Sequence, residues 1–229
     1  MGTVFDNEFA GLILKFSGSA GIDLTEKQAQ LLSRHIQVML VWNSRLNLTR
    51  VTGSEEIIVK HVLDSIVPAK FLPSSGYALD VGTGAGFPGI PLKIIYPDLH
   101  MVLLDSNRKK VSFLAAATAA LGLKGTQALQ GRWQDFSKAR EQLNKFALIT
   151  MRALKFEPQH IRSLASPVLA PGGLFACWGG IDADCMDKAA DSSAEMINHC
   201  DMEFQGDSDY LLPGIKQRRA VRLWKKTSR

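Results

Sequence analysis

Cysteine and long apolar runs are both scarce in this 229-residue chain. The cysteines are Cys177, Cys185 and Cys200, and no two of them are spaced as C-x-x-C. This pattern argues against a disulfide framework or a metal site, and it favours a reducing compartment. No apolar run reaches the roughly 18 residues of a membrane span. Residues 1–21 carry acids and lack the basic start of a signal peptide. We therefore expect a cytoplasmic protein with no membrane partner.

Acidic residues are missing from the C-terminal segment that begins at Lys216, although the whole chain has a net charge of only +5. This segment holds seven basic residues, so the first 215 residues carry a net charge of −2. Such local basicity favours an edge that contacts a polyanion, and the alternative is a solvated tail without a partner. The seven residues are Lys216, Arg218, Arg219, Arg222, Lys225, Lys226 and Arg229.

Glycine, by contrast, is concentrated in residues 77–91, which read YALDVGTGAGFPGIP. A short apolar run ends at Asp80, a loop with four glycines follows, and an apolar pattern then resumes. This pattern predicts a buried strand, a tight turn and a helix start, because glycine lets the backbone turn sharply and approach a ligand. Backbone N–H groups at such a helix start can face a polar or anionic ligand. The glycines are Gly82, Gly84, Gly86 and Gly89.

The spacing around this loop narrows the class of ligand. A dinucleotide fingerprint requires G-x-G-x-x-G, but Phe87 occupies the last glycine position, and the Gly-Lys-Ser/Thr ending of a phosphate-binding P-loop is absent. A second strand-like run, residues 100–104, ends at Asp105, where a carboxylate can accept hydrogen bonds from ribose hydroxyls. A glycine loop with a ribose acid suits a nucleoside cofactor such as S-adenosylmethionine. The alternative is a glycine turn that binds nothing.

Strand and helix patterns alternate along the rest of the chain, which predicts a largely parallel sheet covered on both faces. Ligands then bind outside the carboxyl ends of the strands, where Gly82, Asp105, Trp133 and Arg152 would gather. Thr25 begins a capping box for a helix that runs to about residue 43, and Ser54 can cap a second helix that ends near Val67. The remaining expected helices are 8–16, 91–96, 107–121, 157–170 and 184–198, and the later strands are 127–130, 146–151, 173–178, 202–204 and 220–224.

The second of these N-terminal helices places His61, Asp64 and Ser65 on one face, at positions i, i+3 and i+4. A histidine, a carboxylate and a hydroxyl on one helix face can point into a site. They can equally form a surface group beside the apolar stripe of the same helix. We expect no proton-transfer role for His61 or Asp64.

Taken together, the motifs resemble those of a known family, the bacterial 16S ribosomal RNA guanine-N7 methyltransferases called RsmG, formerly glucose-inhibited division protein B. The resemblance covers roughly residues 25–174 and returns at residues 219–226. The string GTGAGFPGIP together with the upstream H-x-x-D-S is its most specific part. The matching segments are Trp42-Asn43, Asn47-Leu48-Thr49, His61-x-x-Asp64-Ser65, residues 80–91, Leu104-Asp105-Ser106 and Arg152-Ala153.

The resemblance implies a class I, Rossmann-like methyltransferase fold: an α/β domain with a mostly parallel seven-stranded sheet and an N-terminal helical extension. On this basis the extension is residues 1–72, and residues 73–229 form the methyltransferase domain with its basic C-terminal strand and tail. The implied methyl donor is S-adenosylmethionine. The implied substrate is the guanine numbered 527 in 16S rRNA, within the small ribosomal subunit or an assembly intermediate. We expect a monomer.

The resemblance also implies roles for individual residues. Gly82 and Phe87 match the family's cofactor contacts in the glycine loop, to which Gly84 also belongs. Trp133 and Gln134 match the pair beside the adenine, and Arg152 matches the arginine of the fourth strand. Asp105 is the ribose candidate, while His61, Asp64 and Arg219 are candidates for the substrate side. Two positions depart from the family pattern: Trp178 stands where a lysine is common, and Trp133 is bulkier than the usual residue.

Guanine N7 has a free lone pair and no proton, so methylation there needs positioning and a dry site rather than a general base. The basic C-terminal residues, with Arg34, Arg45 and Arg50, can hold the surrounding phosphates. Three alternatives stay open on the sequence alone. They are a methyltransferase for another RNA, a small molecule or a protein, a nicotinamide dehydrogenase, which Phe87 disfavours, and an RNA-binding assembly factor without catalysis.

Overall fold

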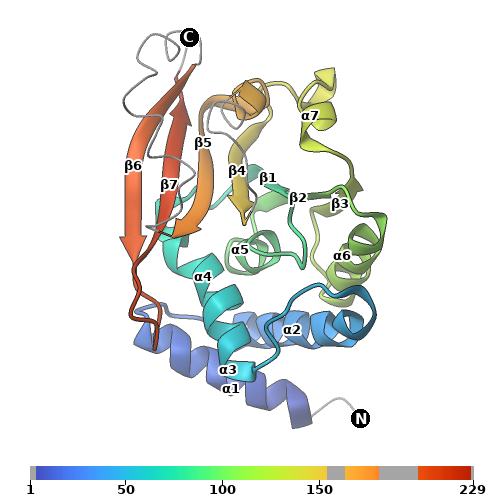
Figure 1. Cartoon of the computed structure of the whole chain (residues 1–229), viewed down its shortest axis with the longest axis vertical. Coiled ribbons are helices and arrows are strands. Elements are labelled where there is room, and N and C mark those ends of the chain that lie inside the picture. The colour runs from blue at the N-terminus through green and yellow to red at the C-terminus, as the bar shows by residue number, and fades with distance from the viewer. Residues whose placement is uncertain (1–3, 154–162, 181–200, 228–229) are drawn as a thin grey trace.

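The computed structural model describes residues 4–153, 163–180 and 201–227. Its centre is a seven-stranded sheet with the order β3-β2-β1-β4-β5-β7-β6 (Figure 1). β1 to β5 are parallel, and β7 runs antiparallel to both of its neighbours, β5 and β6. The predicted fold class is therefore confirmed. The strands are β1 Gly76–Val81, β2 Leu99–Asp105, β3 Thr126–Gln130, β4 Phe146–Arg152, β5 Leu169–Gly180, β6 Met202–Tyr210 and β7 Arg219–Lys226.

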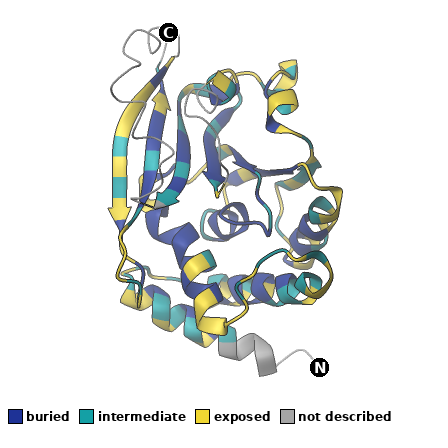
Figure 2. Ribbon diagram, viewed as in Figure 1, coloured by how far each residue is buried: buried dark blue, intermediate teal, exposed yellow. Residues whose placement is uncertain are grey.

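Successive side chains of the central strands pack alternately into two hydrophobic cores, one on each face of the sheet. In β1, for example, Ala78 belongs to the core shared with the N-terminal helices, and its neighbour Leu79 belongs to the core on the other face. Figure 2 shows this burial in the middle of the sheet. Because successive strand residues point to opposite faces, a sheet buried on both sides needs apolar residues at nearly every position. The runs ALDV and MVLLD have that composition.

The N-terminal helices share one hydrophobic core with one face of the sheet. Helix α1 is Val4–Ser19, and α2, Glu26–Leu46, begins at the predicted capping box. In that box Gln28 N donates to Thr25 Oγ1 over 3.2 Å, while Thr25 N donates to Gln28 Oε1 over 2.9 Å. Asn47 ends α2 in the left-handed conformation, with φ 48°. Among the described residues, no helix combines the length and the apolar character needed to cross a membrane.

The helix that the sequence predicts from Ser54 to about Val67 is not a regular α-helix in the structure. It consists of α3 Ser54–Ile57, a π-helical turn η1 Ile58–Leu63, α4 Asp64–Ile66 and a 3₁₀ turn η2 Val67–Phe71. The prediction that Ser54 caps it is wrong, since the N-cap position is Gly53 and no side chain caps the helix there. Single π-turns within helices are frequent at functional sites. The predicted boundary between residues 72 and 73 falls in the connection from η2 to β1 and stays a prediction.

Helices also follow β1, β2 and β3. α5 Gly89–Ile95 and α6 Arg108–Ala120 follow β1 and β2, and α7 Trp133–Phe136 and the 3₁₀ turn η3 Arg140–Gln142 follow β3. Asn107 caps α6 through its side-chain oxygen, and Gly122 follows the end of that helix at φ 62°. Both α5 and α6 contact α2, so α2 lies across the helices that follow the first two strands.

The predicted helix at residues 157–170 is wrong at its C-terminal end. Helical structure stops at Ala165, and β5 already begins at Leu169. The N–H groups of Lys145 and Phe146 donate to the carbonyl of Val168, so strand pairing starts before the Pro-Gly-Gly that resembles a turn. Residues 157–162 and the expected helix at residues 184–198 lie outside the described residues. β6 and β7 are longer than predicted.

Candidate functional site

The glycine loop lies between β1 and α5, at the carboxyl edge of the parallel strands. The backbone N–H groups of Gly82 and Thr83 donate to the carbonyl of Leu104 over 2.8 and 3.2 Å, which ties the loop to the end of β2. Gly84 has φ 58°, a conformation that favours glycine. A Cβ added there would meet nothing nearer than the Gly82 carbonyl oxygen at 3.8 Å. Among the residues that the structure describes, no side chain comes within 4 Å of this added Cβ, which leaves room for a ligand beside Gly84.

Asp80, near the end of β1, contacts the C-terminal end of this loop at Gly89. Its Oδ2 accepts from the Gly89 N–H over 2.9 Å, and its Oδ1 accepts from Thr150 Oγ1 over 2.8 Å. A Cβ at Gly89 would lie 2.8 Å from Asp80 Oδ2, so a larger residue there would break this contact. Complete burial raises the pKa of Asp80 to about 6. Asp80 thus joins β1, α5 and β4 from inside the protein, a role that the sequence motif alone did not reveal.

Asp105, at the end of β2, lies against the same loop. Its Oδ2 accepts from the Gly84 N–H over 3.0 Å, and its Oδ1 accepts from the Asn107 N–H over 2.8 Å. Each carboxylate oxygen has a second lone pair, so both can accept a further hydrogen bond. The open space at Gly84 and the acceptors of Asp105 are therefore adjacent. This arrangement fits a ribose whose hydroxyls bind Asp105, as the sequence predicts, although the contact itself stays a prediction.

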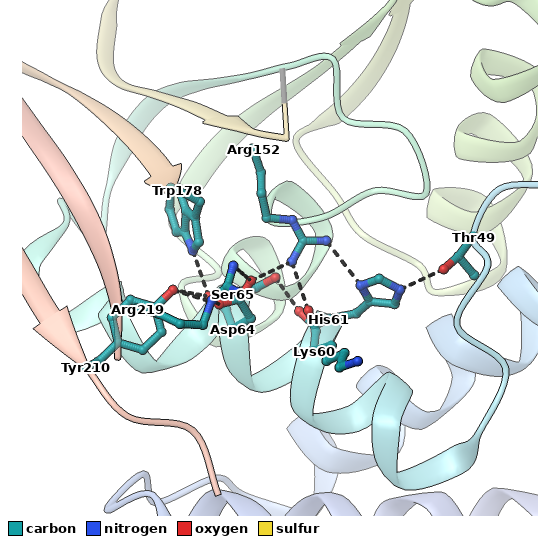
Figure 3. Close-up of polar contacts among 9 residues, drawn as sticks. All are labelled: Thr49, Lys60, His61, Asp64, Ser65, Arg152, Trp178, Tyr210 and Arg219. Atoms are coloured by element: carbon teal, nitrogen blue, oxygen red, sulfur yellow. Dashed lines mark hydrogen bonds and ion pairs between the residues drawn. The ribbon is translucent and has the colours of Figure 1, made fainter. Parts of the chain in front are cut away.

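A second group of polar side chains surrounds Asp64, whose side chain is 3% exposed (Figure 3). Asp64 Oδ2 accepts from Arg152 Nη1 over 3.2 Å and from Arg219 Nη2 over 3.1 Å. Its Oδ1 accepts from the Tyr210 hydroxyl over 2.7 Å and lies 2.6 Å from Arg219 Nε. The indole N–H of Trp178 donates to the backbone carbonyl of Asp64 over 2.7 Å. We call these five residues the Asp64 cluster.

The Asp64 cluster joins α4 to the ends of β4, β5, β6 and β7. A buried carboxylate is costly unless its charge is paired and hydrogen-bonded, and two guanidinium groups and a hydroxyl meet that need here. Burial and the Asp64 charge raise the pKa of Tyr210, so its hydroxyl stays a donor. Because two arginines share one carboxylate, the cluster retains one net positive charge. Of the two, Arg219 is the more exposed, at 32% against 14% for Arg152.

His61 links this cluster to the loop after α2. An arginine can only donate, so His61 Nδ1 accepts from Arg152 Nη2 over 3.4 Å, and the ring proton resides on Nε2. Nε2 then donates to Thr49 Oγ1 over 2.8 Å, and Asn43 Oδ1 accepts from the Thr49 N–H over 2.8 Å. Burial, with a further contribution from the Arg152 charge, lowers the pKa of His61 to about 4. His61 is thus neutral and has both ring nitrogens engaged.

Comparison with known proteins connects this geometry to one family. Residues 28–204 match the GidB family, described as rRNA small subunit methyltransferase G. The chain belongs to this family. A curated relative, ribosomal RNA small subunit methyltransferase G 1 of Syntrophobacter fumaroxidans, is 43% identical over 214 residues, which cover 92% of this chain and 93% of the relative. The methyltransferase G of Moorella thermoacetica is 37% identical over 188 residues, covering 81% and 78% of the two chains.

Solved structures that resemble this methyltransferase G family member are much more distant in sequence. TYW2 of P. horikoshii in complex with MeSAdo has a TM-score of 0.55 and 13% identity, covering 73% of this chain and 63% of that chain. MtNAS in complex with MTA and tNA has a TM-score of 0.52 and 11% identity, covering 96% and 71%. At these identities the likeness shows the fold alone.

Trp133 and Trp178 both have structural roles in this protein. Trp133 is buried in the second core, with its ring 5.9 Å from that of Phe175, while its neighbour Gln134 is exposed at the start of α7. Contact of Trp133 and Gln134 with an adenine stays a prediction, and Gln134 has the more accessible side chain. The indole N–H of Trp178 donates to the backbone carbonyl of Asp64, as described above.

The basic residues predicted to form one edge are spread along β7 and lie at both of its ends. At about 3.4 Å per residue, these two ends are roughly 24 Å apart. Lys216 and Arg218 are exposed in the connection from β6 to β7, at the carboxyl edge where the Asp64 cluster lies. At the other end, Lys226 is buried and donates to the carbonyls of Ser166 and Leu169 over 2.7 and 2.9 Å. In the middle of β7, Arg222 pairs with Asp207. The basic segment is therefore not one continuous phosphate-binding surface.

Proposed function

We propose that the protein transfers a methyl group from S-adenosylmethionine to N7 of guanine 527 in 16S rRNA. The observation that carries the proposal is the open space at Gly84 beside the two acceptor oxygens of Asp105, in a chain of the methyltransferase G family. The substrate would be the small ribosomal subunit or an assembly intermediate, which places the protein in the cytoplasm.

The residues at the carboxyl edge fit the parts of this donor. The backbone of Gly82 and Gly84 lies where the donor approaches most closely, and the Asp105 carboxylate is oriented to accept from the ribose hydroxyls. Gln134, beside Trp133, follows β3, where an adenine base would lie. Phe87 belongs to the same loop, but its side chain packs beneath it, against His61 and Arg152, so we assign its backbone rather than its ring to the donor.

The two arginines of the Asp64 cluster suit anionic parts of the ligands. A guanidinium repels the sulfonium of the donor and attracts its carboxylate, so we assign Arg152 to the carboxylate end. Arg219 is the more exposed, and we assign it, with Lys216 and Arg218, to phosphates of the RNA. Asp64 itself is buried among its partners, so we assign it and His61 to the support of these arginines rather than to direct contact with the guanine.

No residue is assigned as a general base. Bound S-adenosylmethionine would supply a methyl group on a sulfonium sulfur. Transfer to the lone pair of guanine N7 would break the methyl–sulfur bond and leave S-adenosylhomocysteine, so no proton would have to be removed. The neutral, fully engaged His61 supports this assignment, since it has no free nitrogen to receive a proton. The protein's contribution is alignment of the two reactants and exclusion of water.

Methyl transfer mapped to a single base tests the proposal. The purified protein is incubated with isotope-labelled S-adenosylmethionine and small subunits, or their 16S rRNA, from cells that lack this modification. Label at guanine 527, with strand cleavage by the chemistry specific to N7-methylguanine, is the expected result. Label at another RNA or on a small molecule would support a different substrate. RNA binding without any transfer would support an assembly factor without catalysis.

A further inference from the structure

Phe87, in the glycine loop, is enclosed by two histidines from the N-terminal helices. His35, from α2, has its ring centre 4.7 Å from that of Phe87 at an interplanar angle of 37°. His61, from η1, stacks on Phe87 at 5.0 Å and 23°. The glycine loop therefore contacts the helical extension through Phe87 as well as the sheet through its hydrogen bonds to Leu104.

His35 also makes a hydrogen bond to the loop backbone. Its Nε2 lies 2.9 Å from the carbonyl oxygen of Ala85, and both groups are buried. A carbonyl only accepts, so the ring proton is on Nε2, and Nδ1 has no hydrogen-bond partner in the described part of the chain. Burial lowers the pKa of His35 to about 4, because a second proton would place an uncompensated charge inside the protein. His35 is thus a neutral donor.

The hydrogen bond from His35 is made to Ala85, the residue that follows Gly84. Asp105, from the sheet, accepts from the Gly84 N–H, and His35, from the helical extension, donates to the carbonyl of the next residue, Ala85. The peptide between Gly84 and Ala85 therefore lies between two anchors from different parts of the fold. Further along, the N–H groups of Gly86 and Phe87 donate to the Thr83 carbonyl, which closes the turn within the loop itself.

We propose that His35 is a positioning residue of the donor site, one that fixes the Ala85 carbonyl and thereby the conformation of the loop around Gly84. This inference rests on the proposed function, because it assigns to His35 the geometry of the surface that receives S-adenosylmethionine. The N-terminal extension then contributes to donor binding from a position that does not touch the donor.

Two substitutions of His35 distinguish its hydrogen bond to Ala85 from the packing of its ring against Phe87. His35→Phe keeps a ring against Phe87 and removes the N–H donor, whereas His35→Gln removes the ring and keeps an N–H at a similar reach. Calorimetry with S-adenosylmethionine should show about three- to tenfold weaker binding by His35→Phe, since a buried carbonyl loses its partner. His35→Gln should remain within about twofold of the unsubstituted protein. In methyl-transfer assays, the KM for the donor should rise in His35→Phe while kcat changes less than about twofold.

A destabilising variant far from the loop serves as the control. Ile13→Ala removes a fully buried side chain from α1 and should lower the melting temperature without changing donor affinity. Equal donor affinity of His35→Phe and the unsubstituted protein would overturn the inference, as would equal losses in His35→Phe and His35→Gln.

If His35→Phe does not fold, the unsubstituted protein still provides a test. Nitrogen NMR should show the His35 proton on Nε2, and solvent exchange of that proton should slow at least about tenfold when S-adenosylmethionine is added. Unchanged exchange would contradict the inference. Failure of the unsubstituted protein to bind the donor at all would instead contradict the proposed function, so the two failures are distinguishable.

Discussion

The hydroxyl of Tyr210 donates to Asp64 Oδ1 over 2.7 Å, although 146 positions separate the two residues in the chain. This contact joins the C-terminal end of β6 to α4 of the N-terminal extension. Together with the Arg219 contacts, it connects the last two strands of the sheet to the buried carboxylate that also holds Arg152. The extension and the far edge of the sheet are therefore coupled through one side chain.

Tyr210→Phe should lower the free energy of unfolding by about 1–2 kcal/mol, because Asp64 loses a buried hydrogen bond while the ring volume is kept. Urea unfolding followed by circular dichroism measures this change. Tyr77→Phe is the matched control, since Tyr77 is 45% exposed and should change stability by less than about 0.5 kcal/mol. Equal stabilities of the Tyr210 and Tyr77 variants would show that the contact does not contribute.

Asp80 should make stability depend on pH in the acidic range. Its pKa of about 6 in the folded protein lies above the ordinary 3.8, so the folded state binds the proton more tightly than the unfolded state. The free energy of unfolding should therefore decrease as pH rises from about 4 to 6, by at most about 3 kcal/mol from this group. Asp80→Asn, which has a similar shape and no charge, removes this contribution.

The test compares the two proteins at each pH, so that the titration of His35 and His61 cancels. The stability of the unsubstituted protein relative to Asp80→Asn should fall between pH 4 and pH 6 and stay constant above pH 7. A difference that is constant from pH 4 to pH 7 would mean that Asp80 has an ordinary pKa.

His61→Gln should retain methyl transfer at a rate within about tenfold of that of the unsubstituted protein. Removal of a general base commonly costs a factor of 10² to 10⁴, whereas loss of a supporting contact to Arg152 should lower kcat by less than about tenfold. For the same reason, kcat of the unsubstituted protein should be flat between pH 7 and pH 8, above the pKa of about 4 for His61 and the pKa of about 6 for Asp80. A hundredfold loss, together with a pH profile that follows one ionisation, would contradict catalysis without a base.

The double substitution Lys216→Ala and Arg218→Ala should weaken binding to 16S rRNA and make it less sensitive to salt. Each lost phosphate contact reduces the slope of log K against log salt by about 0.7 to 0.9, so two contacts should reduce it by about 1.4 to 1.8. Lys225→Ala, an exposed cation at the opposite end of β7, is the control and should leave the slope unchanged. Equal effects at both ends would mean that the carboxyl edge does not face the RNA.

Much of the site follows from local sequence pattern, because its residues are close together in the chain. The glycine loop, Asp105 and the Thr25 capping box depend on turns and helix starts that a few neighbouring residues determine, and the structure confirms the capping box and the position of the loop. Of the three residues predicted to share one helix face, His61 and Asp64 both contact Arg152. The hydroxyl of Ser65 instead donates to the backbone carbonyl of His61.

The rest depends on tertiary contacts that no local pattern encodes. Tyr210 and Trp178 lie next to Asp64 because β5, β6 and β7 pair with one another in the sheet, so spacing in the sequence does not predict their roles. The inward direction of Trp133 is set by packing against Phe175 from another strand. The His35 contact with Ala85 likewise required α2 to be placed behind the glycine loop.

A crystal structure of the protein with S-adenosylhomocysteine, the demethylated form of the donor, tests the central claim most directly. We predict that the ribose hydroxyls lie within hydrogen-bonding distance of the Asp105 carboxylate and that the ligand approaches the backbone at Gly84. The existing contact of Asp105 with the Gly84 N–H should persist. A ligand bound elsewhere, or an Asp105 that makes no contact with it, would contradict the account.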